Sequence, residues 1–203
     1  MKLHLARFGP MLLAGAFAVI AAAPATARTV EYLDDMTAIS AAADDQGIQG
    51  PFSDKLRSGP VHIALETPKA ADHRVIVASV YCQAYGIDNP VSTLLQDLVK
   101  AAAPTEGNAP ILTLHVLSGS TVLRCLGKSD LEVKCKNRVR IDAEAGFVKA
   151  DGTAVKIPLT ALVEREGRVG GFCGNIARYT GIVTREAGID LIRQAMKAFA
   201  DMA

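Results

Sequence analysis

The sequence predicts an α+β fold, in which two helices pack on one face of a mostly antiparallel sheet. Between Ile111 and Asp142, apolar and polar residues alternate in three runs that two polar turns separate, and Ser118-Gly119-Ser120 forms the first turn. This alternation is typical of an antiparallel meander with one face in water. Stretches with apolar residues at helical spacing precede and follow the meander, at 91–102 and 184–202. Helices on one face of such a sheet bury its apolar side.

The N-terminus has the features of a secretory signal peptide, which we assign to residues 1–27. Lys2 and Arg7 precede the apolar run Met11–Ala23, and Ala25-Thr26-Ala27 fits a cleavage site with small residues. The apolar run is too short to span a bilayer comfortably, so we expect cleavage after Ala27 and no stable membrane span afterwards. The alternative is an uncleaved N-terminal anchor.

Export narrows the possible functions. No cysteine precedes Cys82, so the mature chain lacks the N-terminal cysteine on which bacterial lipoproteins are lipidated. Loss of Lys2 and Arg7 changes the formal net charge from +1 to −1, and a near-neutral domain is a poor binder of nucleic acid. We therefore expect a soluble periplasmic or secreted protein with no nucleic-acid partner and no cofactor.

An acidic arm, residues 28–60, precedes a single α+β domain that spans 61–203. We expect the arm to be partly flexible, with a short helix at Val30–Ala43. Its first part carries many carboxylates against the single cation Arg28: Glu31, Asp34, Asp35, Asp44, Asp45 and Asp54. The domain begins with two predicted strands, Val61–Leu65 and Arg74–Tyr81.

A helix follows these strands. Asn89 is the expected N-cap and Pro90 suits the first helical position. The apolar residues that follow lie on one helix face: Val91, Leu94, Leu95, Leu98, Val99 and Ala102.

The C-terminal half contains a second hairpin and a final helix. Asp151-Gly152 between alternating runs predicts a tight hairpin turn. Pro158 indicates the end of that hairpin's second strand or an edge position, so we expect a charged loop at Ala161–Gly171. The final helix begins at Thr184, or near Asn175 if the earlier apolar residues belong to it.

The four cysteines predict two disulfides. A hairpin register that places Cys125 opposite Cys135 pairs these two, and Cys82–Cys173 remains by elimination. No Cys-x-x-Cys occurs, so we expect no metal site. The same register sets Arg124 opposite Lys136, an unfavourable contact unless an anion or an acidic segment covers it.

We identify no catalytic residue. Cys173 follows glycines at the expected start of a helix, where a thiolate would be stabilised, and its candidate bases are His62, His73 and His115. A structural disulfide explains Cys173 better. Glu164 and Glu166 have the spacing of paired carboxylates, but we interpret them as part of a solvated loop.

A stripe of cations is the main functional candidate. Its members are Arg124, Lys134, Lys136, Arg138 and Arg140. The last four alternate on one face of a strand. Three interpretations of this face are open: a binding site for an anion or a partner, an ordinary solvated face, or a surface that the acidic arm covers. Charge reversal at Lys134, Lys136 and Arg138 is expected to weaken partner binding and to leave the fold intact.

The order of elements resembles that of the outer-membrane lipopolysaccharide-assembly lipoprotein and the ABC-transport auxiliary lipoproteins of bacterial envelopes. The matching parts are the helix Val91–Ala102, the strands from Ile111 to Leu159, and the final helix through Leu191-Ile192 to Phe199. The chain differs in lacking the lipidation cysteine and in carrying four internal cysteines. The resemblance implies a non-enzymatic accessory protein that binds another envelope component.

These observations lead to one functional hypothesis and two alternatives. We expect an exported accessory or binding protein of the cell envelope, whose partner is an envelope protein or an anionic lipid or glycan. The first alternative is a small secreted enzyme with Cys173 as nucleophile. The second is a structural or toxin-neutralising factor that acts through the basic face.

Overall fold

A computed structural model confirms the α+β fold, with a main sheet that is mixed. It describes residues 28–29, 59–75, 77–78, 86–104, 107–127, 132–170 and 172–202. The main sheet has the strand order β2-β6-β7-β8, with bounds His62–Glu66, Ile111–Leu126, Glu132–Val148 and Ala154–Gly170. Strands β6, β7 and β8 are antiparallel, whereas β2 and the short β4 (Val77–Ala78) pair with β6 in parallel.

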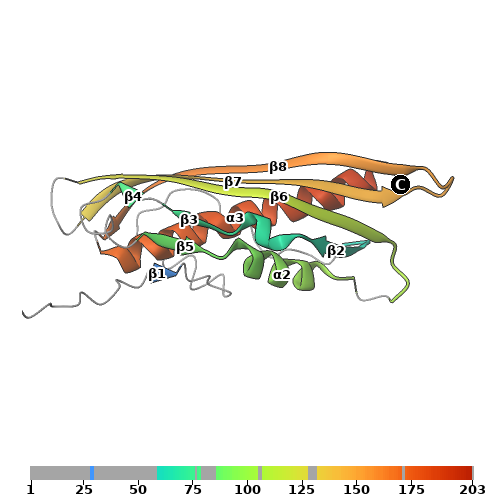
Figure 1. Ribbon diagram of the computed structural model, residues 1–203, viewed down its shortest axis with the longest axis horizontal. Coiled ribbons are helices and arrows are strands. Elements are labelled where there is room, and N and C mark those ends of the chain that lie inside the picture. Colours follow the sequence, from blue (N-terminus) through green and yellow to red (C-terminus); the bar gives the residue numbers. More distant parts are fainter. Residues whose placement is uncertain are drawn as a thin grey trace, which may run out of the picture.

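Two helices lie on the same side of this sheet. Helix α3 (Cys173–Ala200) packs along β7 and β8, and α2 (Val91–Ala102) packs against α3 and the 3-10 helix η1 (Pro68–Ala71). Figure 1 shows α3 running lengthwise beneath the three long strands. A small second sheet, β1-β5-β3, pairs Arg28–Thr29, Ile87–Asn89 and His73–Val75. The three layers enclose the apolar core.

Strand β6 continues through the predicted turn at Ser118-Gly119-Ser120, so that prediction was wrong. The register shifts between Val116 and Ser118, which marks a β-bulge. Backbone of η1 passes directly over Gly119, where a Cβ atom would overlap the carbonyl oxygen of Ala71. The glycine is therefore needed for close packing of η1 and not for a chain reversal.

The hairpin at Asp151-Gly152 is confirmed, and Gly152 has a φ of 86°. Strand β8 nevertheless runs past Pro158 to Gly170, so the loop expected at Ala161–Gly171 is a strand as far as Gly170. Because β8 is the outer strand of the sheet, the missing N–H of Pro158 is tolerated there.

Both helix starts differ from the predictions in detail. Asn89 ends β5, and its buried amide donates to Thr184 Oγ1 at 3.0 Å. The carboxylate of Asp72 caps α2 instead, because Ser92 N and Ser92 Oγ each donate to it at 2.7 Å. Helix α3 begins at Cys173, close to the alternative start near Asn175, and Thr184 lies buried in its middle, where its hydroxyl donates to Thr180 O.

The disulfide between Cys125 and Cys135 is present, with a Cα–Cα distance of 4.0 Å at the end of the β6–β7 hairpin. Several predictions lie outside the described residues. They concern the signal peptide, the helix at Val30–Ala43, most of the acidic arm, Cys82 and the end of the strand Arg74–Tyr81.

Candidate ligand-binding face

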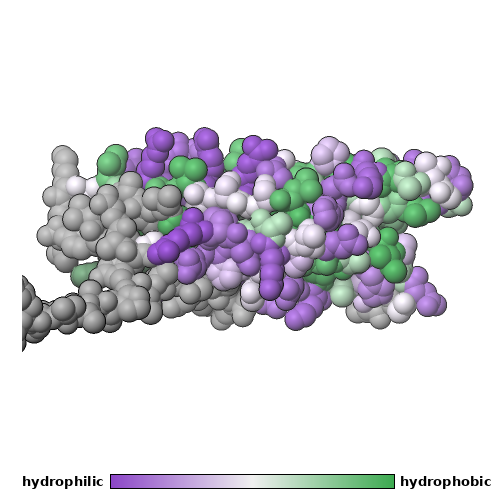
Figure 2. Space-filling model, in the orientation of Figure 1, coloured by the Kyte–Doolittle hydropathy of each residue, from purple (hydrophilic) through white to green (hydrophobic). Residues whose placement is uncertain are grey.

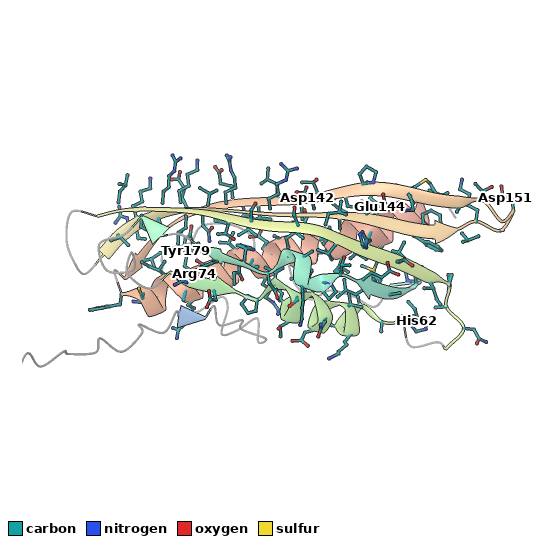
Figure 3. All side chains as sticks on the ribbon, viewed as in Figure 1. His62, Arg74, Asp142, Glu144, Asp151 and Tyr179 are labelled. Carbon is teal, nitrogen blue, oxygen red and sulfur yellow. A yellow bond between two sulfur atoms is a disulfide. The ribbon has the colours of Figure 1, made fainter. Side chains whose placement is uncertain are left out.

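One face of the long strands is turned away from both helices. The side chains labelled Asp142 and Glu144 project from this outer face (Figure 3). Figure 2 shows hydrophilic side chains along it with hydrophobic ones between them. Six of the exposed hydrophobic residues belong to these strands: Ile111, Leu117, Val122, Leu126, Val148 and Leu162.

The predicted stripe lies on this face. Lys134, Lys136, Arg138 and Arg140 are exposed, and the residues between them on β7 are buried. Arg124 on β6 lies opposite Lys136, as the register predicted. The structure therefore brings all five residues of the stripe to one surface.

Two carboxylates from β8 lie beside these cations. Glu164 contacts Lys136 Nζ at 2.6 Å and Arg138 at 2.7 Å, and Glu166 contacts Lys134 Nζ at 3.0 Å. The interpretation of Glu164 and Glu166 as a solvated loop was therefore wrong. The alternation of Leu162, Glu164 and Glu166 with buried neighbours was a signal for a strand, which the charge of the segment obscured.

Ion pairs on this face shift the pKa values of Glu164, Asp142 and Arg140. The pKa of Glu164 is lowered, first by its hydrogen bond with Lys136 and then by that with Arg138. Arg140 lowers the pKa of Asp142, and Asp142 in turn raises the pKa of Arg140. Asp142 also accepts hydrogen bonds from Ser118 and Thr160, so it links three strands across the face.

A hollow of about 200 Å³ opens between the strands. Its lining comprises Val122, Arg124, Lys136, Arg138 and Glu164. Three cations thus surround one carboxylate, and Arg124 forms no ion pair with the described residues. The hollow suits an anionic group that would relieve the contact between Arg124 and Lys136.

The cysteine of the alternative enzyme hypothesis is oxidised, in agreement with the preferred interpretation of Cys173 as a disulfide cysteine. Cys173 is disulfide-bonded, and its predicted partner Cys82 lies outside the described residues. His73 is held by Ala71 O and Thr121 Oγ1, both at 2.7 Å, whereas His115 lies on the outer face. Within the described ranges, no group of three or more His, Cys, Asp or Glu residues is placed to hold a metal ion.

Sequence reasoning missed a polar cluster between the sheet and α3. Arg165 and Glu186 form an ion pair there, and Tyr179 donates to Arg165 O at 2.6 Å. Burial raises the pKa values of Glu186 and Tyr179. Both amide atoms of the fully buried Asn137 lack a hydrogen-bond partner in the part of the chain that the structure describes. These residues join distant strands and a helix, so no local pattern indicates them.

The described helices include none that is both long and apolar enough to cross a membrane. Comparisons with known proteins give no family for the chain. No protein family model matches it, and no characterised protein shows significant similarity to it.

Proposed function

We propose that this protein is an exported, soluble accessory protein of the bacterial cell envelope, which binds an anionic ligand or partner without catalysing a reaction. Its binding surface is the basic sheet face, which comprises Arg124, Lys134, Lys136, Arg138 and Arg140. The observation that supports this proposal is the position of these five exposed cations on one face of the sheet, which the described helices do not cover.

The cations of the stripe outnumber the carboxylates that contact them. Among the described side chains, the five cations lie with the three carboxylates of Asp142, Glu164 and Glu166. The excess positive charge attracts anions over roughly a Debye length, about 8 Å at physiological ionic strength. Binding of an anion would therefore be salt-sensitive.

Export is supported by the signal-peptide pattern and by the Cys125–Cys135 disulfide, because such bonds persist in oxidising compartments. The accessory role is supported by the order of elements, a helix, long strands and a final helix, which resembles that of the envelope lipoproteins named above. The alternative enzyme with Cys173 as nucleophile would first require reduction of a disulfide, so we do not propose it.

Single charge reversals test the proposal. Arg124→Glu removes a cation without breaking an ion pair of the described residues, and Arg178→Glu makes the same change at an exposed position of helix α3. The probes are phosphatidylglycerol vesicles, heparin and poly-glutamate, each at low and high salt. We expect salt-sensitive binding to at least one probe, several-fold weaker for Arg124→Glu and unchanged for Arg178→Glu. Equal binding by all three proteins, or no binding by the wild type, would contradict the proposal.

A further inference from the structure

A second and larger concavity lies at the other end of the outer face. It has a volume of about 730 Å³ and is bordered by β2, β6, β7 and β8. Glu144 and the hairpin residue Asp151 mark this end of the molecule (Figure 3). We refer to this concavity as the hairpin groove. None of the five residues of the basic stripe lines it.

Gly146 keeps the groove open. It lies on the outer face of β7 between Glu144 and Val148, and it is paired with Thr113 and Lys156 on the neighbouring strands. A Cβ atom there would meet nothing closer than 3.9 Å, and the φ of Gly146 is not positive. The fold therefore does not require a glycine at this position. Glycine within a strand often marks the close approach of a ligand or another chain.

The two ends of the hairpin groove differ in chemistry. Towards the hairpin, Ile111 and Val148 are 65% and 68% exposed. Away from the hairpin, Glu66, His115 and Glu144 lie side by side on three neighbouring strands. These features suit a ligand with an apolar part and a polar part.

The carboxylates at the polar end of the groove favour a ligand whose polar part is a cation. Lys156 contacts Glu144 at 2.9 Å, whereas the ion-pair contact of Glu66 with the described residues is to the ring of His115, at 3.6 Å. The two carboxylates outnumber the one lysine at this end. A lysine or arginine side chain near Glu66 would balance this excess.

The distance between Gly146 and the carboxylate row indicates the conformation of the ligand. Gly146 and Glu144 are two residues apart on one strand, which corresponds to about 6.6 to 6.8 Å. Alternate side chains of an extended peptide have the same spacing. Glu144, His115 and Glu66 form one row across three neighbouring strands. We propose that the hairpin groove binds an extended peptide segment of a protein partner that lies along β7, with an apolar side chain over Gly146 and, two residues away, a lysine or arginine over this row, whose long side chain extends towards Glu66. This site is independent of the anion-binding function proposed above.

A selection experiment tests the site. A phage-displayed library of random heptapeptides is selected on the mature protein and counter-selected on Gly146→Leu, which fills the groove. We expect enrichment of peptides with an apolar residue and a lysine or arginine two positions apart. Peptides that bind both proteins equally, an acidic consensus, or no enrichment would overturn the proposal.

One enriched peptide is then synthesised and titrated against three variants. We expect binding at least tenfold weaker for Gly146→Leu and several-fold weaker for Glu66→Gln, which leaves the shape of the groove unchanged. Arg124→Glu, in the basic stripe, should bind as the wild type does, which separates this site from the anion site. Urea unfolding of each variant checks the fold, and Glu66→Gln provides the test if Gly146→Leu is unfolded. Sedimentation of the free protein completes the test, since a dimer that Gly146→Leu dissociates would show that a second copy occupies the groove.

Discussion

Arg165 and Glu186 form the most enclosed ion pair of the described residues, with side chains 27% and 13% exposed. Arg165 Nε and Glu186 Oε2 are buried without a hydrogen-bond partner among the described residues. Burial raises the pKa of Glu186, against the opposite effect of Arg165. The attraction between these two charges therefore offsets a substantial desolvation cost, and the pair adds little net stability.

Removal of one partner should cost more than removal of both. We expect Glu186→Leu alone to lower the free energy of unfolding by about 3 kcal/mol, because it leaves a half-buried guanidinium without its partner. The double variant Arg165→Met/Glu186→Leu should recover most of that loss. Urea unfolding at pH 7 measures both values. A double variant that is as unstable as Glu186→Leu alone would show that the pair itself stabilises the fold.

Asp142 should make stability depend on pH in the acidic range. Its pKa in the fold lies below the ordinary 3.8, so its stabilising effect is complete above pH 3.8 and is lost as the pH falls through the lowered pKa. We expect Asp142→Asn to lower stability by about 1 to 2 kcal/mol at pH 7. The difference from the wild type should shrink below pH 3.8. A difference that is constant from pH 7 to pH 3 in urea unfolding would contradict this assignment.

Individual hydrogen bonds and a β-bulge fit the long strands to the elements that pack on them. The bulge in β6 makes room for η1, and the hydroxyl of Thr67 donates to Val116 O beside it at 2.6 Å. At the edge of the sheet, two side chains of α3 donate hydrogen bonds to the backbone of β8: Gln194 donates to Thr160 O at 3.1 Å, and Tyr179 donates to Arg165 O. Together with Pro158, these contacts reduce the capacity of a 17-residue outer strand to pair with another chain.

Two glycines of the same sheet should respond differently to alanine. Gly119→Ala places a Cβ atom against the backbone of Ala71, which must move, so we expect a loss of about 2 kcal/mol in the free energy of unfolding. Gly146→Ala has room and should leave stability unchanged or slightly raised. Equal effects of the two substitutions in thermal or urea unfolding would show that η1 does not pack tightly on the bulge.

Across the whole molecule, the two faces of the sheet have separate roles. The inner face packs against α3 and buries apolar residues such as Val139 and Ile141, whereas the outer face carries the charges. Surface ion pairs contribute little to stability, with typical values of about 0 to 1 kcal/mol each. The pattern of charge on the outer face can therefore change with little effect on the core.

This separation predicts how charge reversal affects stability and binding. Reversal of Lys134, Lys136 and Arg138 to glutamate sets three new carboxylates beside Glu164 and Glu166, so we expect a loss of about 1 to 2 kcal/mol. Addition of Glu164→Lys and Glu166→Lys restores opposite charges and should recover that stability. Binding to the anionic probes should stay weak in this five-fold variant, because fewer cations surround the hollow. Recovery of both properties would show that the cations have only a structural role.

Much of this architecture follows from local spacing. The apolar stripe of 91–102 forms α2, the Asp151-Gly152 turn joins β7 to β8, and the register of the β6–β7 hairpin joins Cys125 to Cys135. Each of these features depends on residues close together in the chain, where periodicity and turn chemistry act directly. The five cations of the stripe share a face for the same reason.

Other features depend on contacts between distant segments. The local sequence at Gly119 indicates a turn, but the glycine instead allows η1 to pack on β6. The local sequence of 161–170 indicates a loop, but this segment forms a strand because its backbone pairs with β7. Glu164 and Glu166 become partners of the stripe only through that pairing. The start of α3, the Asp72 cap of α2 and the Arg165–Glu186 pair likewise arise where sheet and helices meet. Tertiary packing outweighs local propensity at these positions, because the free energy gained by burial and backbone pairing exceeds the preferences of single residues.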